Sequence, residues 1–348
     1  MQEQIKNTLS VGSLVDIVKK QWGPFLVKLE WTWRRHPMLL VGIVILVFMA
    51  LLAIFAPYLW TVDPTAVDPP NRLKEPGAAY WFGTDFVGRD VYSRTIYGTR
   101  VSLAVGFAVG AMSVVTAAFF GLLAGYFNTF DLIIMRIMDA IMSIPHILLA
   151  IALVSMVGGS VPIVIFAIWF VTFPRAVRVV RSSVLSLREE VYVEAARAIG
   201  AKTPRILWFH VLPGTIAPLM VTGTLIIAGS ILTEAILSFL GAGIDPETPA
   251  WGSMMADGRR TISMAMWVVG IPGGFLTLTV LGINMIGDNL RDILDPKLSR
   301  SSKSWSSYRE FRQLRSCISA VPIRRAFRHD APPARAVRAR WRPPGRQR

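Results

Sequence analysis

The chain has 348 residues, of which 53% are hydrophobic and only 17% are charged. This combination is typical of a multi-span membrane protein. The formal net charge of +15 does not indicate nucleic-acid binding, because residues 300–348 alone contain 14 basic and two acidic residues. The rest of the chain, with 23 basic and 20 acidic side chains, is close to neutral. The single cysteine, Cys317, excludes an internal disulfide and a thiolate metal cluster.

Residues 1–37 are predicted to form a cytoplasmic, amphipathic arm on membrane lipid. From Leu14 to Trp33, apolar residues and tryptophans alternate with charged residues at helical spacing, which suits a helix lying on the membrane surface. Gly23 and Pro24 interrupt the pattern, so two short helical pieces are expected rather than one.

Six apolar runs reach the length of about 20 residues that a helix needs to cross a hydrocarbon core about 30 Å thick. The runs are Met38–Leu59, Val101–Tyr126, Leu132–Val157, Val161–Val180, Thr215–Leu240 and Trp267–Ile286. The first run starts too late and continues too long for the core of a cleavable signal. The predicted fold class is therefore an all-α integral membrane protein with six transmembrane helices in residues 38–298.

The lysines and arginines outside the spans predict the orientation of the chain. The arm and the loop before the fifth span, together with the helix end leading into it, hold 13 basic residues, against 7 on the opposite face. Because basic residues concentrate on the cytoplasmic side, both termini and the loop around Gly200 are predicted to be cytoplasmic. The loop from Trp60 to Thr99 and the residues from Pro246 to Arg260 are then predicted to face outward.

A compact motif lies at the end of the Trp60–Thr99 loop. It consists of Gly83, Thr84, Asp85, Gly88, Arg89 and Asp90. The alternative to a functional signature is an exposed turn before an interfacial helix. In that case Asp85, Arg89 and Asp90 pair at the surface, each pair contributing about 0–1 kcal/mol.

A second motif occupies the loop before the fifth span. It consists of Glu194, Ala195, Ala196, Gly200, His210, Leu212 and Pro213. Small residues allow close approach to a partner surface, and Gly200 suits the left-handed position that ends a helix. A corner at residues 202–204, a second short helix at 205–211 and Pro213 at the start of the span complete a predicted helix–turn–helix. An ordinary solvated loop is the alternative.

The second motif resembles the EAA loop of ABC-importer permeases, in which Glu-Ala-Ala, Gly and Leu-Pro occur at the same spacing. His210 stands at the usual Ile position, a change associated with the dipeptide, oligopeptide and nickel branch. The Gly83–Asp90 motif and the later segments Ser238–Gly241, Pro249–Met254 and Gly287–Pro296 also resemble the second permease subunit of that branch. The resemblance covers residues 34–298 in collinear order.

This resemblance implies a type I ABC-importer permease in a bacterial inner membrane. It implies a heterodimer with a homologous first permease, two cytoplasmic ATPases docked on the EAA-type loop, and an extracytoplasmic solute-binding protein. Peptides are the substrates it favours; nickel chelates, glutathione and sugars use similar subunits. The runner-up is a proton-coupled secondary transporter, which usually shows internal repeats that this sequence lacks.

Two carboxylates inside the predicted spans are candidate pathway residues. Asp139 either lines the pathway or pairs with Arg136, three residues before it, and Pro145 is expected to bend the span they share. Glu234 either lines the pathway or makes an interhelical hydrogen bond. The arginines Arg175, Arg178 and Arg181 recur at helical spacing; the positive-inside rule explains them better than a voltage sensor does.

Catalytic, metal-binding and cofactor-binding motifs find no support in the sequence. The four histidines include no i,i+4 pair, and no phosphate-binding Walker sequence is present. The chain is therefore predicted not to be an enzyme, with ATP bound by another subunit. The basic tail, residues 299–348, is predicted to be disordered. The tail either lies on anionic lipid or is a read-through or frameshifted extension. Its arginines alone do not favour a nucleic-acid-binding protein.

Overall fold

The computed structural model describes residues 37–294, so the predictions for the N-terminal arm and the basic tail lie outside the described residues. Its longer helices are α2 (Pro37–Phe55), α3 (Val91–Tyr126), α4 (Asn128–Met142), α5 (His146–Val157), α6 (Val161–Leu187), α9 (Leu212–Phe239) and α11 (Trp267–Leu294). Short helical elements are η1 (Ala56–Tyr58), η2 (Pro69–Asn71), α7 (Val191–Ala198), α8 (Thr203–Ile206), the π-helical turn η3 (Leu207–Val211), α10 (Trp251–Gly258) and η4 (Arg259–Thr261). Within residues 37–294 the only β-type pairing is an isolated bridge between Thr84 and Asp90.

The predicted fold class is confirmed. Five helices are long and apolar enough to cross a membrane, and the bent pair α4 and α5 makes a sixth candidate span. The predicted bend of the span over residues 132–157 is confirmed, because α4 and α5 meet at an angle of 84°. Pro145 provides the reason: it lacks an N–H group, and its ring disfavours helical geometry at Ile144 before it.

Several helices extend beyond the apolar runs that predicted them. Helix α3 begins at Val91, ten residues before the predicted Val101, because the carboxylate of Asp90 accepts a hydrogen bond from the Ser93 N–H at 2.9 Å. Helix α6 continues seven residues past Val180 to Leu187. Hydropathy reports where lipid ends, whereas capping and backbone hydrogen bonds decide where a helix ends.

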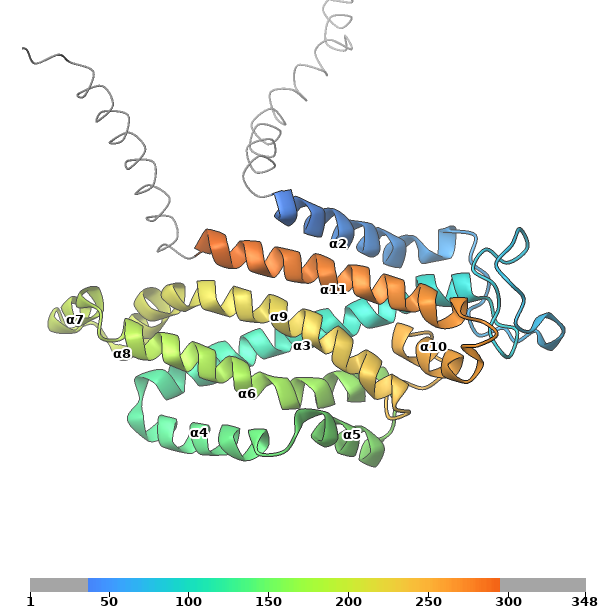
Figure 1. Cartoon of the computed structure of the whole chain (residues 1–348). Coiled ribbons are helices and arrows are strands. Elements are labelled where there is room, and N and C mark those ends of the chain that lie inside the picture. Colours follow the sequence, from blue (N-terminus) through green and yellow to red (C-terminus); the bar gives the residue numbers. More distant parts are fainter. Residues whose placement is uncertain (1–36, 295–348) are drawn as a thin grey trace, which may run out of the picture. The chain divides into compact units, whose positions relative to one another are not determined.

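Helix α3 lies at the centre of the bundle, where it packs against α6 and α9, while α11 packs against α2 and α9 (Figure 1). Glycines permit the close contact between α3 and α6. A Cβ atom added at Gly121 would lie 2.6 Å from the Cβ of Val180, and one at Gly125 would lie 2.5 Å from that of Val184. Small residues thus let two long apolar helices approach closely, as is common in membrane bundles.

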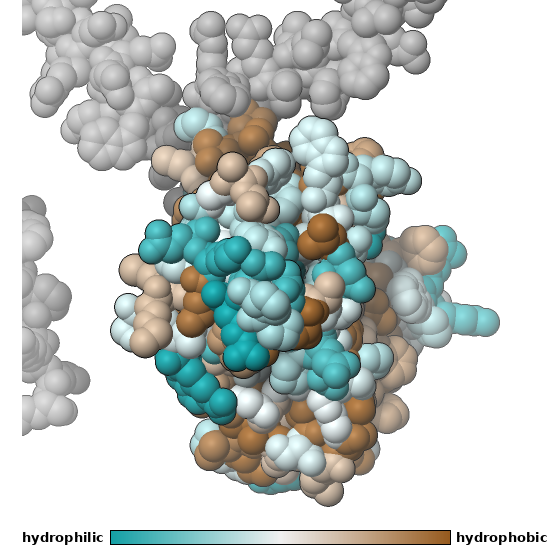
Figure 2. Space-filling view, turned by 90° about the vertical axis from the view of Figure 1, so that its right-hand side faces the viewer, coloured by the Kyte–Doolittle hydropathy of each residue, from teal (hydrophilic) through white to brown (hydrophobic). Residues whose placement is uncertain are grey.

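The two ends of the bundle differ in construction. The end that we call the cap end holds the loop of residues 56–90 and the short helix α10, packed against α9 and α11 (Figure 1). The opposite end, called the loop end, holds α7 and α8, which project beyond the long helices. Figure 2 looks onto the cap end, where hydrophilic residues gather at the centre and hydrophobic residues lie along the lower edge.

Candidate functional site

The second sequence motif forms the projecting elements of the loop end. Gly200 has φ +81°, the left-handed conformation predicted for it. Its N–H donates to the Arg197 carbonyl at 2.9 Å, and the Ala201 N–H donates to the Ala196 carbonyl at 3.0 Å. This pair of bonds is the Schellman arrangement, which closes the end of α7 and requires a residue that tolerates positive φ.

Helix α7 has one packed face and one open face. Val193 and Ala196 are buried, next to Ile206 and Val211 in the same hydrophobic cluster. Glu194 and Ala195 are exposed on the other face. Of the Glu-Ala-Ala residues at positions 194–196, only Ala196 therefore packs against other parts of the chain.

The loop end exposes an apolar tip, defined by Val191, Ile199, Trp208 and Phe209. The exposed fraction is 86% for Ile199, 74% for Phe209 and 64% for Trp208. Large apolar side chains exposed together at a protruding loop mark an interaction surface. The described residues of the chain therefore leave the apolar tip uncovered.

His210 lies in the π-helical turn η3, just before Leu212 and Pro213 open α9. Its Nδ1 atom is buried without a hydrogen-bond partner among the described residues. The Tyr192 hydroxyl donates to its carbonyl at 3.4 Å. Partial burial and the nearby Glu190 carboxylate raise the pKa of the Tyr192 phenol, so this donor stays protonated at neutral pH.

Residues 205–211 are helical, as predicted. Helix α8, η3 and α9 follow one another without a break, so helical structure runs from Thr203 to Phe239. Pro204 occupies the first turn of this helix, where a missing N–H removes no helical hydrogen bond, and Pro213 follows the π-helical turn η3 at the second position of α9. The tip is thus joined to the span by continuous helix.

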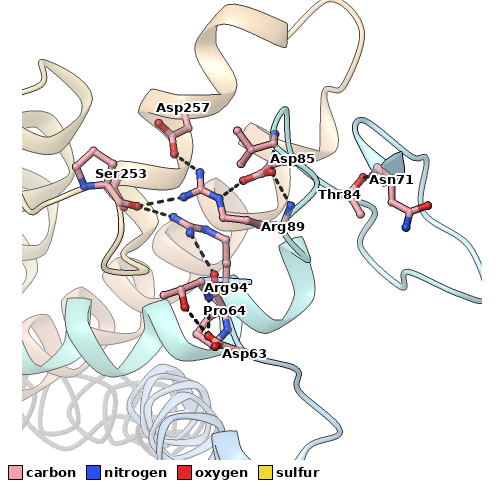
Figure 3. Close-up of polar contacts among 12 residues, drawn as sticks. Asp63, Pro64, Asn71, Thr84, Asp85, Arg89, Arg94, Ser253 and Asp257 are labelled. Carbon is pink, nitrogen blue, oxygen red and sulfur yellow. Dashed lines mark hydrogen bonds and ion pairs between the residues drawn. The ribbon is translucent and has the colours of Figure 1, made fainter. Parts of the chain in front are cut away.

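The first sequence motif lies at the cap end and forms the ionic cluster, defined as Asp85, Arg89, Arg94 and Asp257 (Figure 3). Arg89 Nε donates to Asp85 Oδ2 at 2.6 Å, and Arg89 Nη2 donates to Asp257 Oδ2 at 2.9 Å. Asp85 is 3% exposed and Arg89 8% exposed. The alternative of an exposed turn with surface ion pairs is therefore wrong, because this network is buried.

Arg94 extends the network to the backbone of two loops. Its guanidinium donates to the Pro246 carbonyl at 3.0 Å and to the Pro64 carbonyl at 3.2 Å, and the residue is 1% exposed. Arg89 also reaches the Pro246 carbonyl, at 3.5 Å. Two planar guanidinium groups thus tie the first loop, the start of α3 and the loop before α10 together.

The remaining motif residues shape the loop around the cluster. Gly83 and Gly88 have φ +74° and +89°, and a Cβ atom at Gly88 would lie 1.8 Å from the Asp68 carbonyl oxygen. Thr84 Oγ1 donates to the Asn71 carbonyl at 2.6 Å, and its own carbonyl accepts from Trp267 Nε1 at 3.3 Å. The two glycines therefore provide a backbone conformation that other residues rarely adopt, and Thr84 provides hydrogen bonds between separate segments of the cap end.

The two candidate pathway carboxylates have different surroundings. Glu234 is fully buried and accepts hydrogen bonds from Ser102 of α3 at 3.4 Å and from Ser238 at 2.9 Å, which is the interhelical alternative. Asp139 pairs with Arg178 of α6, and its side chain is 52% exposed. The predicted pair with Arg136 is wrong, because Asp139 reaches across to the neighbouring helix instead.

Two cavities of about 470 Å³ accompany these sites. The cap cavity is bounded by residues of the α9–α10 loop together with Asp257, Arg259 and Arg260. The membrane cavity lies between the bend of α4 and α5, the middle of α6 and the middle of α9. The sequence signalled neither cavity, since each is assembled from segments far apart in the chain.

Long apolar helices, a polar cap at one end and an unfinished apolar tip at the other define a subunit of a membrane assembly. The chain belongs to the family of binding-protein-dependent transport system inner membrane components, whose model matches residues 117–300. A second model, the N-terminal TM domain of oligopeptide transport permease C, matches residues 31–76. The resemblance drawn from the sequence is thereby confirmed.

Curated relatives match most of the described chain. The "Probable peptide ABC transporter permease protein y4tQ" of Sinorhizobium fredii is 49% identical over 77% of this chain and 91% of the relative. The dipeptide transport system permease protein DppC of Alkalihalophilus pseudofirmus is 44% identical over 76% and 88%. The glutathione transport system permease protein GsiD of Pectobacterium atrosepticum is 40% identical over 81% and 93%.

The chain is thus a multi-pass inner-membrane permease subunit of an ABC transporter. Membership of the family implies that it works with a further permease, ATPase and binding-protein subunits.

Proposed function

We propose that this chain forms half of the import pathway for di- or oligopeptides, paired with a homologous first permease. The relatives named for peptide and dipeptide transport and the permease C match at residues 31–76 support this substrate class. Glutathione is the main alternative, because GsiD is named for it at 40% identity. Nickel chelates and sugars remain weaker alternatives from the resemblance alone.

The apolar tip is the docking surface for a cytoplasmic ATPase, and it carries the proposal. Ile199, Trp208 and Phe209 are not covered by other described residues of the chain, and moving each large apolar side chain from water into a partner contributes about 1.5–3 kcal/mol. Gly200 ends α7 sharply beside them, and Glu194 and Ala195 face outward from the same helix. The continuous helix from Thr203 to Phe239 carries a displacement of the tip into the membrane.

The orientation follows from this assignment and from the loop charges. The tip and both termini lie in the cytoplasm, and the cap end faces outward, where the solute-binding protein docks. Figure 2 shows that this end is hydrophilic at its centre, as suits a surface for a water-soluble partner. The buried ionic cluster beneath it gives the partner a rigid platform.

The membrane cavity is this chain's share of the pathway. It is lined by α6 and α9, the two helices that flank the docking loop. Neither Glu234 nor Asp139 is among its lining residues. Two other residues of α4, Ile141 and Met142, do line the cavity. A role for the two carboxylates in the pathway is therefore indirect, through the placement of α4 and α9.

Co-purification and uptake test the function together. An affinity-tagged chain expressed with its neighbouring genes is expected to bring down a second permease and nucleotide-binding subunits. Reconstituted vesicles are expected to accumulate labelled dipeptide only with ATP and loaded binding protein. Uptake driven by a proton gradient without ATP would contradict the proposal. Accumulation of labelled glutathione in preference to dipeptide would instead reassign the substrate.

A further inference from the structure

Three arginines of α6 have different environments. Arg178 pairs with Asp139, and Arg181 pairs with Asp131 through its Nε and Nη2 atoms, the latter at 2.6 Å. Both carboxylates come from α4. Arg175 lies one turn before Arg178, lines the membrane cavity, and has no ion pair within residues 37–294.

The positive-inside rule accounts for the sign of the charge on Arg175 but not for its surroundings in the helix. Arg175 lies near the middle of α6, in a helix apolar enough to span a membrane. A charged side chain inside a span is costly and usually faces a water-filled cavity or a partner of opposite charge. Since α4 supplies carboxylates only to the other two arginines, the membrane cavity is where the Arg175 charge is solvated.

The charged side chain in the lining of the membrane cavity is the cation Arg175. The polar groups of this lining are His146, Thr172, Arg175, Thr222 and Thr233, with apolar residues between them. Aspartate and glutamate are missing from this lining as the described residues form it. The cap cavity differs, because Asp245 and Asp257 line it together with Arg259 and Arg260.

We propose that Arg175 receives the carboxylate of a translocated peptide in the membrane cavity. This inference rests on the proposed function. A carboxylate that leaves water for a confined site inside the membrane loses its hydration. A guanidinium compensates for this loss by donating two parallel hydrogen bonds to the carboxylate. The threonine hydroxyls on α6 and α9 in the same cavity donate to carbonyls of their own helices, so they can accept hydrogen bonds from the N–H groups of the peptide backbone. Arg175 is then a specificity-determining residue for acids over uncharged ends.

A transport assay with preloaded binding protein tests this role directly. Vesicles containing the whole complex receive saturating binding protein loaded with a labelled dipeptide, either as the free acid or as its C-terminal amide. Saturation removes differences in binding-protein affinity from the comparison. The variants are Arg175→Gln and Arg175→Lys, with Arg178→Gln as the matched control one turn away.

Arg175→Gln is expected to slow uptake of the free acid about tenfold and to leave the amide unchanged, because one charge-assisted bond is lost. Arg175→Lys is expected to retain most of the free-acid rate. Arg178→Gln is expected to affect both peptides equally. An acid-to-amide ratio of uptake rates in Arg175→Gln that equals the wild-type ratio, whether both rates are kept or both fall equally, would overturn the inference.

Two further outcomes separate the possible failures. If Arg175→Gln prevents assembly, Arg175→Lys decides, since it keeps the charge but loses the planar fork. A small loss confined to the free acid supports the role, whereas an acid-to-amide ratio equal to that of the wild type overturns it. If the wild-type complex moves neither peptide, the proposed function fails and the role of Arg175 fails with it.

Discussion

The cap end and the loop end show two opposite ways of using polar and apolar residues. At the cap end, charged residues are buried and satisfied by one another, so that Arg89 alone joins Asp85 to Asp257. At the loop end, large apolar residues such as Ile199 and Phe209 are left exposed. A finished network indicates a rigid element within the subunit. An unfinished apolar surface indicates that a partner completes it.

The first prediction concerns the cap end, where the largest effect is expected. Arg89→Ala removes the cation paired with the buried Asp85 and the half-buried Asp257, and breaking a buried pair typically costs about 3–5 kcal/mol. We expect a marked loss of thermal stability of the purified complex. Glu247→Gln is the control, because this exposed carboxylate of the same end makes no ion pair among the described residues. Similar melting temperatures for both variants would show that the cap is not rigidly held by its ionic cluster.

The second prediction concerns Gly200 at the loop end. A Cβ atom there would meet no neighbour within 4 Å, but the φ of +81° disfavours any other residue by about 1–2 kcal/mol. Gly200→Trp is expected to reach the membrane and to lose ATP-driven uptake, because the bulky ring occupies the docking surface. Gly200→Ala, which carries the backbone cost alone, is expected to lose much less. Normal uptake by Gly200→Trp would exclude this residue from the docking surface.

The third prediction concerns the pair between α4 and α6, which lies between the two ends. Both side chains are about half exposed, so the pair between Asp139 and Arg178 contributes at most about 1 kcal/mol. Asp139→Asn is expected to lower the melting temperature of the complex by much less than Arg89→Ala does. A loss of stability as large as that of Arg89→Ala would mean that α4 depends on this pair.

The fourth prediction is that removal of residues 299–348 has no effect on uptake. The family model ends at residue 300, and residues 299–348 have 14 basic residues and few apolar ones to bury. The truncated chain is expected to assemble and transport at the wild-type rate. Loss of assembly in that deletion would make the tail a third partner surface beside the two ends.

The sequence predicted the class of fold because hydropathy over about 20 residues depends only on lipid thickness. It also predicted the conformation of Gly200, since a glycine that ends a helix has a local reason. The pair of Arg89 with Asp85 could be proposed from the motif, but its second partner was not predictable, because Asp257 lies 168 residues further along the chain. Asp139 was misassigned for the same reason: spacing along one helix suggested Arg136, whereas the partner belongs to another helix.

The most direct measurement is cross-linking from the tip. Ile199→Cys in a Cys317→Ser background places a single thiol at the most exposed point of the tip, beside Gly200. In the assembled complex we expect a short cross-linker to join this thiol to an ATPase subunit, and ATP to change the yield. An impermeant maleimide added to intact cells is expected to leave it unlabelled. Labelling from outside, or a cross-link to the solute-binding protein, would contradict the assignment of the loop end to the ATPase.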